Sequence, residues 1–430
     1  MKKQDNLLLT FIFLIFFTSG IAFPQIVFEE YFYPKTLRVD YIHSGSNEND
    51  NYHFKQMTEE PFWGGSKKNL IDTFEYGKYQ VQLLSKNDNK LIYSRNYSTL
   101  FSEWQTTAEA KKINKAFEET VAVPFPKNEA ILKIYTRDKK HNLILKFEMA
   151  INPKSIYIRK NSFSSFPVTR IAGEADASKS VDIAILAEGY TAAQMERFRE
   201  DCRKFAGYLF NSKPYKENKD KFNIYAIESV CPDSGTDIPG NGVWVNTAFN
   251  SSFFSLGLDR YLMTESYWKV RDAAANVPYD QIYILVNTDR YGGGAIFNYY
   301  NVCVNRNPHE EYVFVHEFGH GFSFLADEYY DSETTYEEFY DINLEPLEPN
   351  LSTLVDFDRK WKNLVSPGTP IPTPVKDEYI GKVGAFEGGG YVKEKVYRPR
   401  YDCSMNSISV DNYCPVCVEA ITKMIEFYSD

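Results

Sequence analysis

The sequence predicts a two-domain protein in which an N-terminal all-β sandwich is followed by an α/β domain. A chain of 430 residues is long enough for two or three domains with a sizeable core. From about residue 25 to residue 167, short apolar runs alternate with polar turns, which is typical of a sandwich. After the polar stretch 172–179, apolar strands alternate with helical patterns, which is typical of an α/β domain. We therefore place the two domains at residues 23–167 and 168–430.

The first 22 residues have the layout of a secretory signal peptide. Lys2 and Lys3 precede the apolar run 7–17, and small residues end at Ala22, where cleavage is expected. A retained membrane anchor is the alternative interpretation of this run. No cysteine lies near Ala22 to form a lipobox, and no later run approaches the ~18 apolar residues of a membrane span. We expect a secreted or periplasmic protein with no membrane span after signal removal, in a compartment that permits disulfides.

In the N-terminal domain, three segments approximate the period-two alternation of half-buried strands: 36–41, 79–84 and 130–135. Polar turns such as 87–89 separate them. The histidines of this domain, His43, His53 and His141, have no neighbour at metal-ligand spacing. We interpret them as structural or solvated, and no catalytic motif stands out in this domain.

In the C-terminal domain, the runs 181–186, 222–229 and 281–286 read as buried strands. A helix is expected after residues 189–191, with Thr191 and Gln194 as its capping box. An amphipathic helix is expected over residues 414–428. This succession of strands and helices is the basis of the α/β prediction.

The composition excludes some classes of partner. The net charge is −10 and the pI is about 5.3, which argues against a nucleic-acid-binding protein because phosphate recognition needs a basic surface. Aromatic residues make up 16% of the chain, which suits β-rich structure or surfaces that contact carbohydrate or peptide.

The segment 307–321 is expected to form one helix. Asn307 can cap it, Pro308 suits the first helical position, and Glu310 completes an Asn-x-x-Glu capping box. The candidate catalytic and metal-binding residues lie further along this helix.

His316 and His320 lie four residues apart, so a helix presents both on one face at zinc-chelating spacing. Glu317 lies about 100° round the helix, where it reaches a metal-bound water rather than the metal. This is the HExxH metallopeptidase motif, with Glu317 as the candidate catalytic residue. The alternative is a helix with two solvated histidines.

A carboxylate must complete this site, because none of the six histidines lies beyond His320. Asp327 is the preferred third ligand, because Gly321 and Ser323 offer a turn directly after the helix, and Glu328 is the second choice. Glu310 and Glu311 lie on the wrong turn of the helix. Zinc suits two histidines, one carboxylate and an open fourth position. The expected cofactor is therefore one catalytic Zn²⁺.

Six further motifs accompany HEFGH (316–320) in this domain. They are LADEY (325–329), AEGYT (187–191), SGTDIPG (234–240), YGGG (291–294), YRP (397–399) and CSM (403–405). Together they resemble the IgA-peptidase family of bacterial zinc metallopeptidases, within the metzincins. The resemblance covers roughly residues 170–428, and the N-terminal domain looks like that family's own N-terminal domain.

The resemblance implies a metzincin-like fold and several residue roles. Met405 would be the Met-turn residue, packed beneath the zinc without binding it. Gly292, Gly293 and Gly294 would belong to an edge strand to which an extended peptide substrate adds. The alternative for these glycines is a flexible loop.

Two departures from the family pattern concern the chain after the second histidine. The glycine expected three residues after it is Ser323, and the third ligand expected six residues after it is Ala326, so Asp327 requires a turn one residue longer. Ser407 replaces the tyrosine that stabilises the oxyanion in some metzincins, which leaves Tyr401 and Tyr413 as candidates.

All six cysteines lie in the C-terminal domain. Cys414 and Cys417 resemble a redox pair or half of a zinc knuckle, but no second close pair is present. A disulfide from Cys403 to Cys414 or Cys417, tying the Met-turn to the last helix, is preferred over both.

The expected function is that of a secreted zinc metalloendopeptidase, a hydrolase of peptide bonds in extracellular proteins or glycoproteins. Glu317 would act as general base on a zinc-bound water. The β domain is a possible contact for glycoproteins. The alternative is a non-catalytic extracellular protein that binds host glycoproteins or glycans, against which the intact His316, Glu317 and His320 argue.

Overall fold

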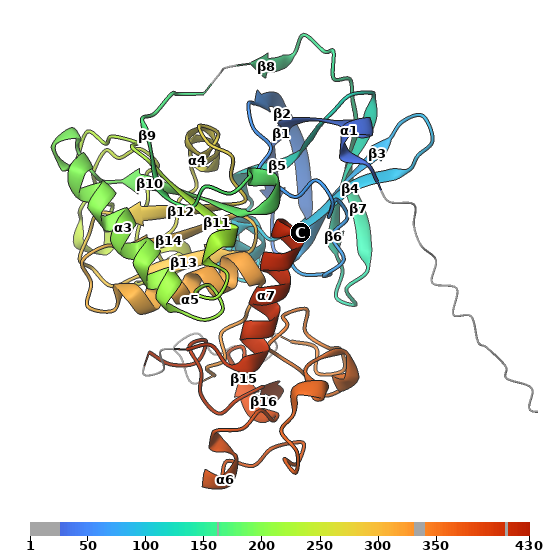
Figure 1. Ribbon diagram of the computed structural model, residues 1–430, viewed down its shortest axis with the longest axis vertical. Helices are drawn as coiled ribbons and strands as arrows, with labels where there is room; N and C mark the ends of the chain where they lie inside the picture. Colours follow the sequence, from blue (N-terminus) through green and yellow to red (C-terminus); the bar gives the residue numbers. More distant parts are fainter. Residues whose placement is uncertain (1–25, 161–162, 331–339, 409–411) are drawn as a thin grey trace, which may run out of the picture.

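The computed structural model describes residues 26–160, 163–330, 340–408 and 412–430 (Figure 1). The expected signal peptide, residues 1–22, lies outside these ranges. Figure 1 shows a β-rich region in blue to cyan, an α/β region in green to orange, and an orange lobe at the bottom of the view. The last helix runs from that lobe back between the other two regions.

The N-terminal region consists of two four-stranded sheets, with strand orders β5-β1-β2-β8 and β4-β3-β6-β7. The strands are β1 (Phe32–Gly45), β2 (Asp50–Glu60), β3 (Tyr79–Ser85), β4 (Leu91–Tyr97), β5 (Lys115–Pro126), β6 (Ala130–Arg137), β7 (Leu143–Ile151) and β8 (Ile158–Lys160). Inward side chains of both sheets, such as Leu37, Leu83 and Leu132, share one buried core. The predicted all-β sandwich is confirmed. His43 is structural, because it is fully buried with its Nδ1 atom 3.0 Å from Glu119.

The α/β region is built on a six-stranded sheet of order β13-β14-β12-β10-β11-β9. Its strands are β9 (Val168–Ala172), β10 (Val181–Glu188), β11 (Phe222–Ile227), β12 (Gln281–Val286), β13 (Gly293–Ile296) and β14 (Tyr300–Val304). The four central strands are parallel and both edge strands are antiparallel to their neighbours. Helices cover both faces, which explains why the central strands are apolar runs without alternation.

One face of this sheet packs against α3 (Met195–Asn211), α5 (Glu310–Ser323) and α7 (Pro415–Ser429). The other face packs against α4 (Tyr267–Ala274) and against α2 (Leu100–Trp104), which the N-terminal half of the chain supplies. The α/β prediction is confirmed, and the two halves of the chain share a core.

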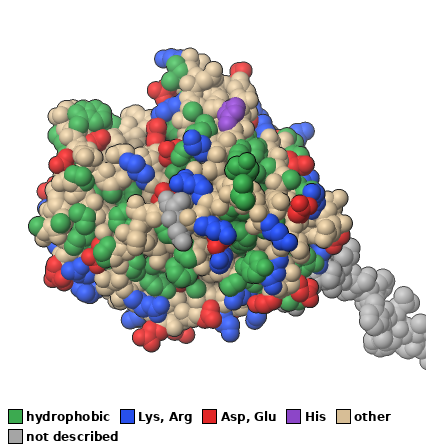
Figure 2. All heavy atoms as spheres, turned by 90° about the horizontal axis from the view of Figure 1, so that it is seen from above, with side chains coloured by type: hydrophobic (Ala, Val, Ile, Leu, Met, Phe, Trp, Pro, Cys, Tyr) green, Lys and Arg blue, Asp and Glu red, His purple; other side chains and the backbone are tan. Residues whose placement is uncertain are grey.

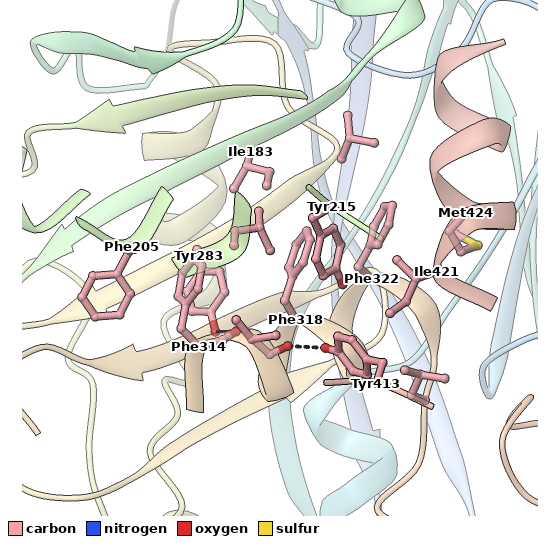
Figure 3. Close-up of a cluster of buried hydrophobic side chains, with 14 of the residues drawn as sticks. Ile183, Phe205, Tyr215, Tyr283, Phe314, Phe318, Phe322, Tyr413, Ile421 and Met424 are labelled. Carbon is pink, nitrogen blue, oxygen red and sulfur yellow. Dashed lines mark hydrogen bonds between the residues drawn. The ribbon is translucent and has the colours of Figure 1, made fainter. Parts of the chain in front are cut away.

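The inner side of α5 is held by aromatic packing (Figure 3). Phe314, Phe318 and Phe322 follow each other at four-residue spacing, so they lie on one face of the helix. The Phe314 ring stacks on Tyr283 of β12 with ring centroids 4.3 Å apart. Ile421 of α7 belongs to the same core. This packing fixes the helix that carries the two histidines.

The orange lobe of Figure 1 contains α6 (Asp377–Ile380), β15 (Phe386–Gly389) and β16 (Val392–Arg398), the two strands being antiparallel. The short helix α1 (Phe28–Tyr31) precedes β1. Within the described ranges, no helix combines the length and apolar character that crossing a membrane requires.

The face in Figure 2 mixes basic and acidic side chains, with apolar side chains between them. Large apolar side chains are exposed in the loop between β7 and β8, where Ile156 is 88% and Tyr157 is 79% exposed.

A buried ion cluster joins the sandwich to the α/β region. Arg38 of β1 is 1% exposed and lies 3.0 Å from Asp40, 3.3 Å from Glu60 and 2.6 Å from Asp272 of α4. Asp40 and Glu60 are also fully buried. The positive charge of the Arg38 guanidinium therefore balances the negative charge of carboxylates that water does not reach.

We expect Arg38→Met to destabilise the protein by about 3–5 kcal/mol, because it leaves Asp40 and Glu60 buried without their cation. Denaturant unfolding followed by fluorescence measures the change. The matched control is Lys35→Met, since Lys35 forms an exposed pair with Glu59 and such pairs contribute about 0–1 kcal/mol. Equal effects of the two substitutions would contradict the importance of the buried cluster.

Candidate metal centre

The helix that carries the histidines begins later than predicted. α5 starts at Glu310, with His309 as its N-cap residue and no side-chain cap. The predicted cap, Asn307, instead accepts a hydrogen bond from the His309 amide in the turn before the helix, at 3.0 Å. The predicted capping box is therefore wrong, although the helix itself is present.

The two histidines converge as their spacing predicts. Their Nε2 atoms lie 3.0 Å apart. The Nδ1 atom of His316 lies 2.9 Å from the carbonyl oxygen of Ser404, and that of His320 lies 2.5 Å from the carbonyl oxygen of Leu325. Because a carbonyl oxygen only accepts, each Nδ1 carries the proton, and both Nε2 lone pairs are directed into the centre.

The end of α5 explains the longer turn before the carboxylate. The helix continues through Ser323, and the left-handed residue that ends it is Phe324, with φ of 55° and ψ of 31°. Its amide donates back to His320, and the Leu325 amide donates to Gly319. The helix end thus lies one residue beyond Ser323, the position that glycine takes in the general metzincin pattern. The carboxylate moves by the same single residue, to Asp327.

Asp327 and Glu328 point in opposite directions, as neighbours in an extended segment do. Asp327 Oδ1 lies 3.1 Å from His316 Nε2 and 3.3 Å from His320 Nε2. The Glu328 carboxylate instead accepts a hydrogen bond from Asn350, at 3.0 Å. The structure therefore brings Asp327, and not Glu328, to the histidines.

Contacts from the C-terminal lobe hold the Asp327 segment in place. Asn350 makes two 2.8 Å hydrogen bonds with the backbone of Ala326, one as donor and one as acceptor. The Gly390 amide donates to the Asp327 carbonyl oxygen at 2.8 Å, and the Tyr391 hydroxyl donates to Asp327 Oδ2. Oδ1 is thereby left directed at the two Nε2 atoms.

The donor set fits a metal ion. Three electron-pair donors lie within 3.3 Å of one another, slightly closer than the about 3.4 Å expected around a tetrahedral zinc with bonds near 2.0–2.1 Å. Such a convergence is unfavourable unless a cation or a proton lies between the atoms. Although burial would lower the pKa of His320, Asp327 raises it to about 9, so the carboxylate favours positive charge at this point.

Glu317 lies beside the two histidines and outside the set of converging atoms. Burial raises the pKa of its carboxyl, and the charges of His320 and His316 oppose that rise. A Cβ atom on Gly293 would lie 3.2 Å from Glu317 Oε1, so the carboxylate faces the first residue of β13. Glu317 is not among the three donors that converge here.

At Gly293 the edge of β13 is not open to an added strand. β13 is an edge strand, as expected, but both outward backbone groups of Gly293 are already bonded: its amide to Arg260 at 3.4 Å and its carbonyl to Leu262 at 3.2 Å. A Cβ atom on Gly292 would lie 2.4 Å from Arg260 O, and one on Gly294 would lie 2.6 Å from Met263 Sδ. Segment 260–263 thus approaches Gly292 and Gly294 closely, whereas a Cβ atom on Gly293 would meet Val313, Val302 and Glu317.

Met405 packs against the helix that carries the two histidines. The residue is fully buried, and its Sδ atom is 3.2 Å from the position of a Cβ on Gly319, on the underside of α5. The preceding residue, Ser404, binds His316 through its carbonyl.

Neither tyrosine proposed for the oxyanion lies at the centre. Tyr413 is buried in the core, and its hydroxyl donates to the Val315 carbonyl oxygen (Figure 3). The ring of Tyr401 packs against Phe386 of β15, 6.2 Å between centroids.

Sequence patterns did not reveal three side chains around the centre. Besides Tyr391, these are Arg260, whose charge lowers the pKa of Glu317, and Glu103 of α2. Glu103 accepts a hydrogen bond from Tyr261, and burial raises its pKa to about 7 while His320 opposes that rise. The N-terminal half thus places a carboxyl close to the site. These residues are far apart in the chain, so no spacing pattern could identify them.

The six cysteines are all buried free thiols, so the expected disulfide from Cys403 is not present. Cys414 and Cys417 have their sulfur atoms 3.6 Å apart, well beyond the about 2.05 Å of a disulfide.

Comparison with known proteins places the chain in a family. The family described as IgA Peptidase M64 matches residues 169–382 and 376–425, and the family described as Peptidase M64 N-terminus matches residues 27–148. A search of curated proteins found no match. Since the peptidase match alone covers more than half of the 430 residues, the non-catalytic alternative is set aside. The chain belongs to the M64 (IgA peptidase) family of metallopeptidases and carries that family's N-terminal domain.

Proposed function

We propose that this metallopeptidase is a zinc-dependent endopeptidase in which His316, His320 and Asp327 bind the catalytic ion. The observation that carries the proposal is the convergence of the two Nε2 atoms and Asp327 Oδ1 within 3.3 Å, with both Nδ1 atoms held by backbone carbonyls. Zinc is the metal best suited to this donor set, because two imidazoles and a carboxylate leave a fourth position open.

Zinc, when bound, supplies a Lewis acid that polarises the scissile carbonyl and makes water acidic at neutral pH. Glu317 acts as general base: its carboxylate accepts a proton from the attacking water and passes it to the departing amine nitrogen. The orientation of Glu317 beside the histidines and against Gly293 supports this role. Tyr391 keeps Asp327 oriented, which leaves Oδ1 free for the ion.

The substrates proposed are polypeptides of extracellular proteins or glycoproteins. The N-terminal signal-like segment supports secretion to the outside or the periplasm. We assign a possible glycoprotein contact to the β sandwich, whose exposed Tyr157 lies between β7 and β8.

Chelation should abolish peptide hydrolysis, and added Zn²⁺ should restore it while Mg²⁺ should not, because the site has two nitrogen donors that Mg²⁺ disfavours. A mixed peptide library incubated with and without chelator, and analysed by mass spectrometry, measures both the loss and the cleavage preference. Internal cleavage identifies an endopeptidase, whereas removal of single terminal residues would contradict that assignment. Hydrolysis that persists in metal-free protein would contradict the zinc mechanism.

A further inference from the structure

A second group of metal-binding side chains lies beside the catalytic centre. Glu328, Cys403, Cys414 and Cys417 are each 0% exposed, and one donor atom from each lies within 4.8 Å of the others. They come from three separate segments: the strand-like segment after α5, the Met-turn, and the first turn of α7.

Two of the distances between these donor atoms match a tetrahedral thiolate site. Zinc–sulfur bonds of about 2.3 Å place neighbouring sulfur atoms about 3.8 Å apart and a sulfur about 3.6 Å from a carboxylate oxygen. The Cys414 and Cys417 sulfurs are 3.6 Å apart, and Cys417 Sγ is 3.5 Å from Glu328 Oε1. No further side chain is needed to complete four ligands.

An unsatisfied carboxylate atom points to a missing cation. Glu328 Oε1 is hydrogen-bonded by Asn350, but Oε2 is buried and has no hydrogen-bond partner among the residues that the structure describes. A buried carboxylate with one oxygen lacking a partner is unfavourable, and a cation bound to this carboxylate would offset that cost.

Burial raises the pKa of the Cys403 and Cys417 thiols, so their ionisation requires a nearby cation or local dipoles. Cys414 is the N-cap residue of the fifteen-residue helix α7 and Cys417 lies in its first turn, where the helix dipole stabilises thiolate. The Met405 amide lies 3.3 Å from Cys403 Sγ and donates to it. Binding a dication would release the thiol protons to solvent.

We propose that Cys403, Cys414, Cys417 and Glu328 bind a second Zn²⁺ ion with a structural role. Four protein ligands close the coordination sphere and leave no position for substrate, unlike the catalytic site. The half-knuckle that the sequence contains at Cys414 and Cys417 is completed by Cys403 and by the carboxylate of Glu328, which no cysteine pattern reveals.

The second ion would join the catalytic ligand segment to the Met-turn. Glu328 follows Asp327 directly, its amide donates to Met405 O at 2.7 Å, and Cys403 lies two residues before Met405. Binding Glu328 and Cys403 to one ion would therefore fix Asp327 and the Ser404 carbonyl, both of which contact the histidines.

Metal analysis of the purified full-length protein tests this site. Wild-type protein should contain about two zinc ions per chain, and the double variant His316→Ala/His320→Ala should contain about one. Cys417→Ser should lose the second ion, whereas Cys202→Ser, a matched change at a buried cysteine in α3, should keep both. A single zinc in wild-type protein that the histidine variant loses would overturn the second site and leave the catalytic proposal intact.

Two measurements on folded protein cover the case in which Cys417→Ser does not fold. X-ray absorption on the zinc of the double histidine variant should detect sulfur neighbours at about 2.3 Å, and only nitrogen or oxygen neighbours would overturn the proposal. Thiols of wild-type protein, counted in denaturant with chelator and without reductant, should number six. Two fewer would indicate a disulfide in place of the ion and would also overturn it.

Discussion

Glu317→Gln should reduce peptide hydrolysis by about 10²–10⁴-fold while zinc content stays unchanged. The amide has the shape of the carboxylate but cannot accept a proton from the attacking water. Glu317 is not one of the converging metal donors, so its replacement leaves the metal ligands in place. Single-turnover rates on a cleavable peptide, together with elemental analysis, measure the two quantities separately.

The control for this substitution is Glu311→Gln, the same chemical change on the exposed side of the same helix. It should leave both turnover and zinc content unchanged. If Glu317→Gln retained nearly full turnover, the general base would have to be another residue, and Glu103 would be the next carboxyl to test because its charge acts on the same centre.

Asp327→Ala should weaken binding of the catalytic zinc by more than the 10–100-fold that loss of an outer contact costs, because it removes a direct ligand. Two imidazoles alone leave an open site from which zinc dissociates easily. Competition with a calibrated zinc chelator measures the affinity. Peptide hydrolysis is the readout, because it responds to zinc in the catalytic site and not to zinc bound elsewhere.

Tyr391→Phe provides a graded control. It removes the hydroxyl that donates to Asp327 Oδ2 and leaves the carboxylate in place, so its effect should not exceed about 10–100-fold. Wild-type affinity in Asp327→Ala would contradict the ligand assignment and require another carboxylate as the third ligand.

The strongly periodic parts of the fold were predictable. The runs at 181–186 and 281–286 form β10 and β12, and the capping box of Thr191 and Gln194 is present before α3. These elements depend on local patterns: a continuous apolar run for a strand covered on both faces, and a side chain that satisfies free amides at a helix start. The start of α5 was not predictable, because Asn307 bonds within a preceding turn instead.

The glycines at 292–294 illustrate a second limit. A glycine pattern indicates that some backbone or side chain approaches closely, but it does not identify which one. Here the approaching groups belong to residues 253–263 and to Val302, Val313 and Glu317, so crowding by the protein's own groups is enough to account for the glycines.

The sequence by itself indicated the order of a β-rich region before an α/β region, the pairing of His316 with His320 on one helix face, and the choice of a carboxylate as the proposed third ligand. Four-residue spacing on a helix and the absence of later histidines are local facts that no tertiary contact alters. Only the tertiary structure decided between Asp327 and Glu328, and only it brought Cys403 to Cys414 and Cys417. Both outcomes depend on long-range contacts. Asn350 and Gly390 bind the backbone of residues 326–327, and the side chains of Asp327 and Glu328 then face the histidines and the cysteines respectively. When contacts with residues distant in the chain fix the direction of a side chain, no periodic pattern in the sequence predicts that direction.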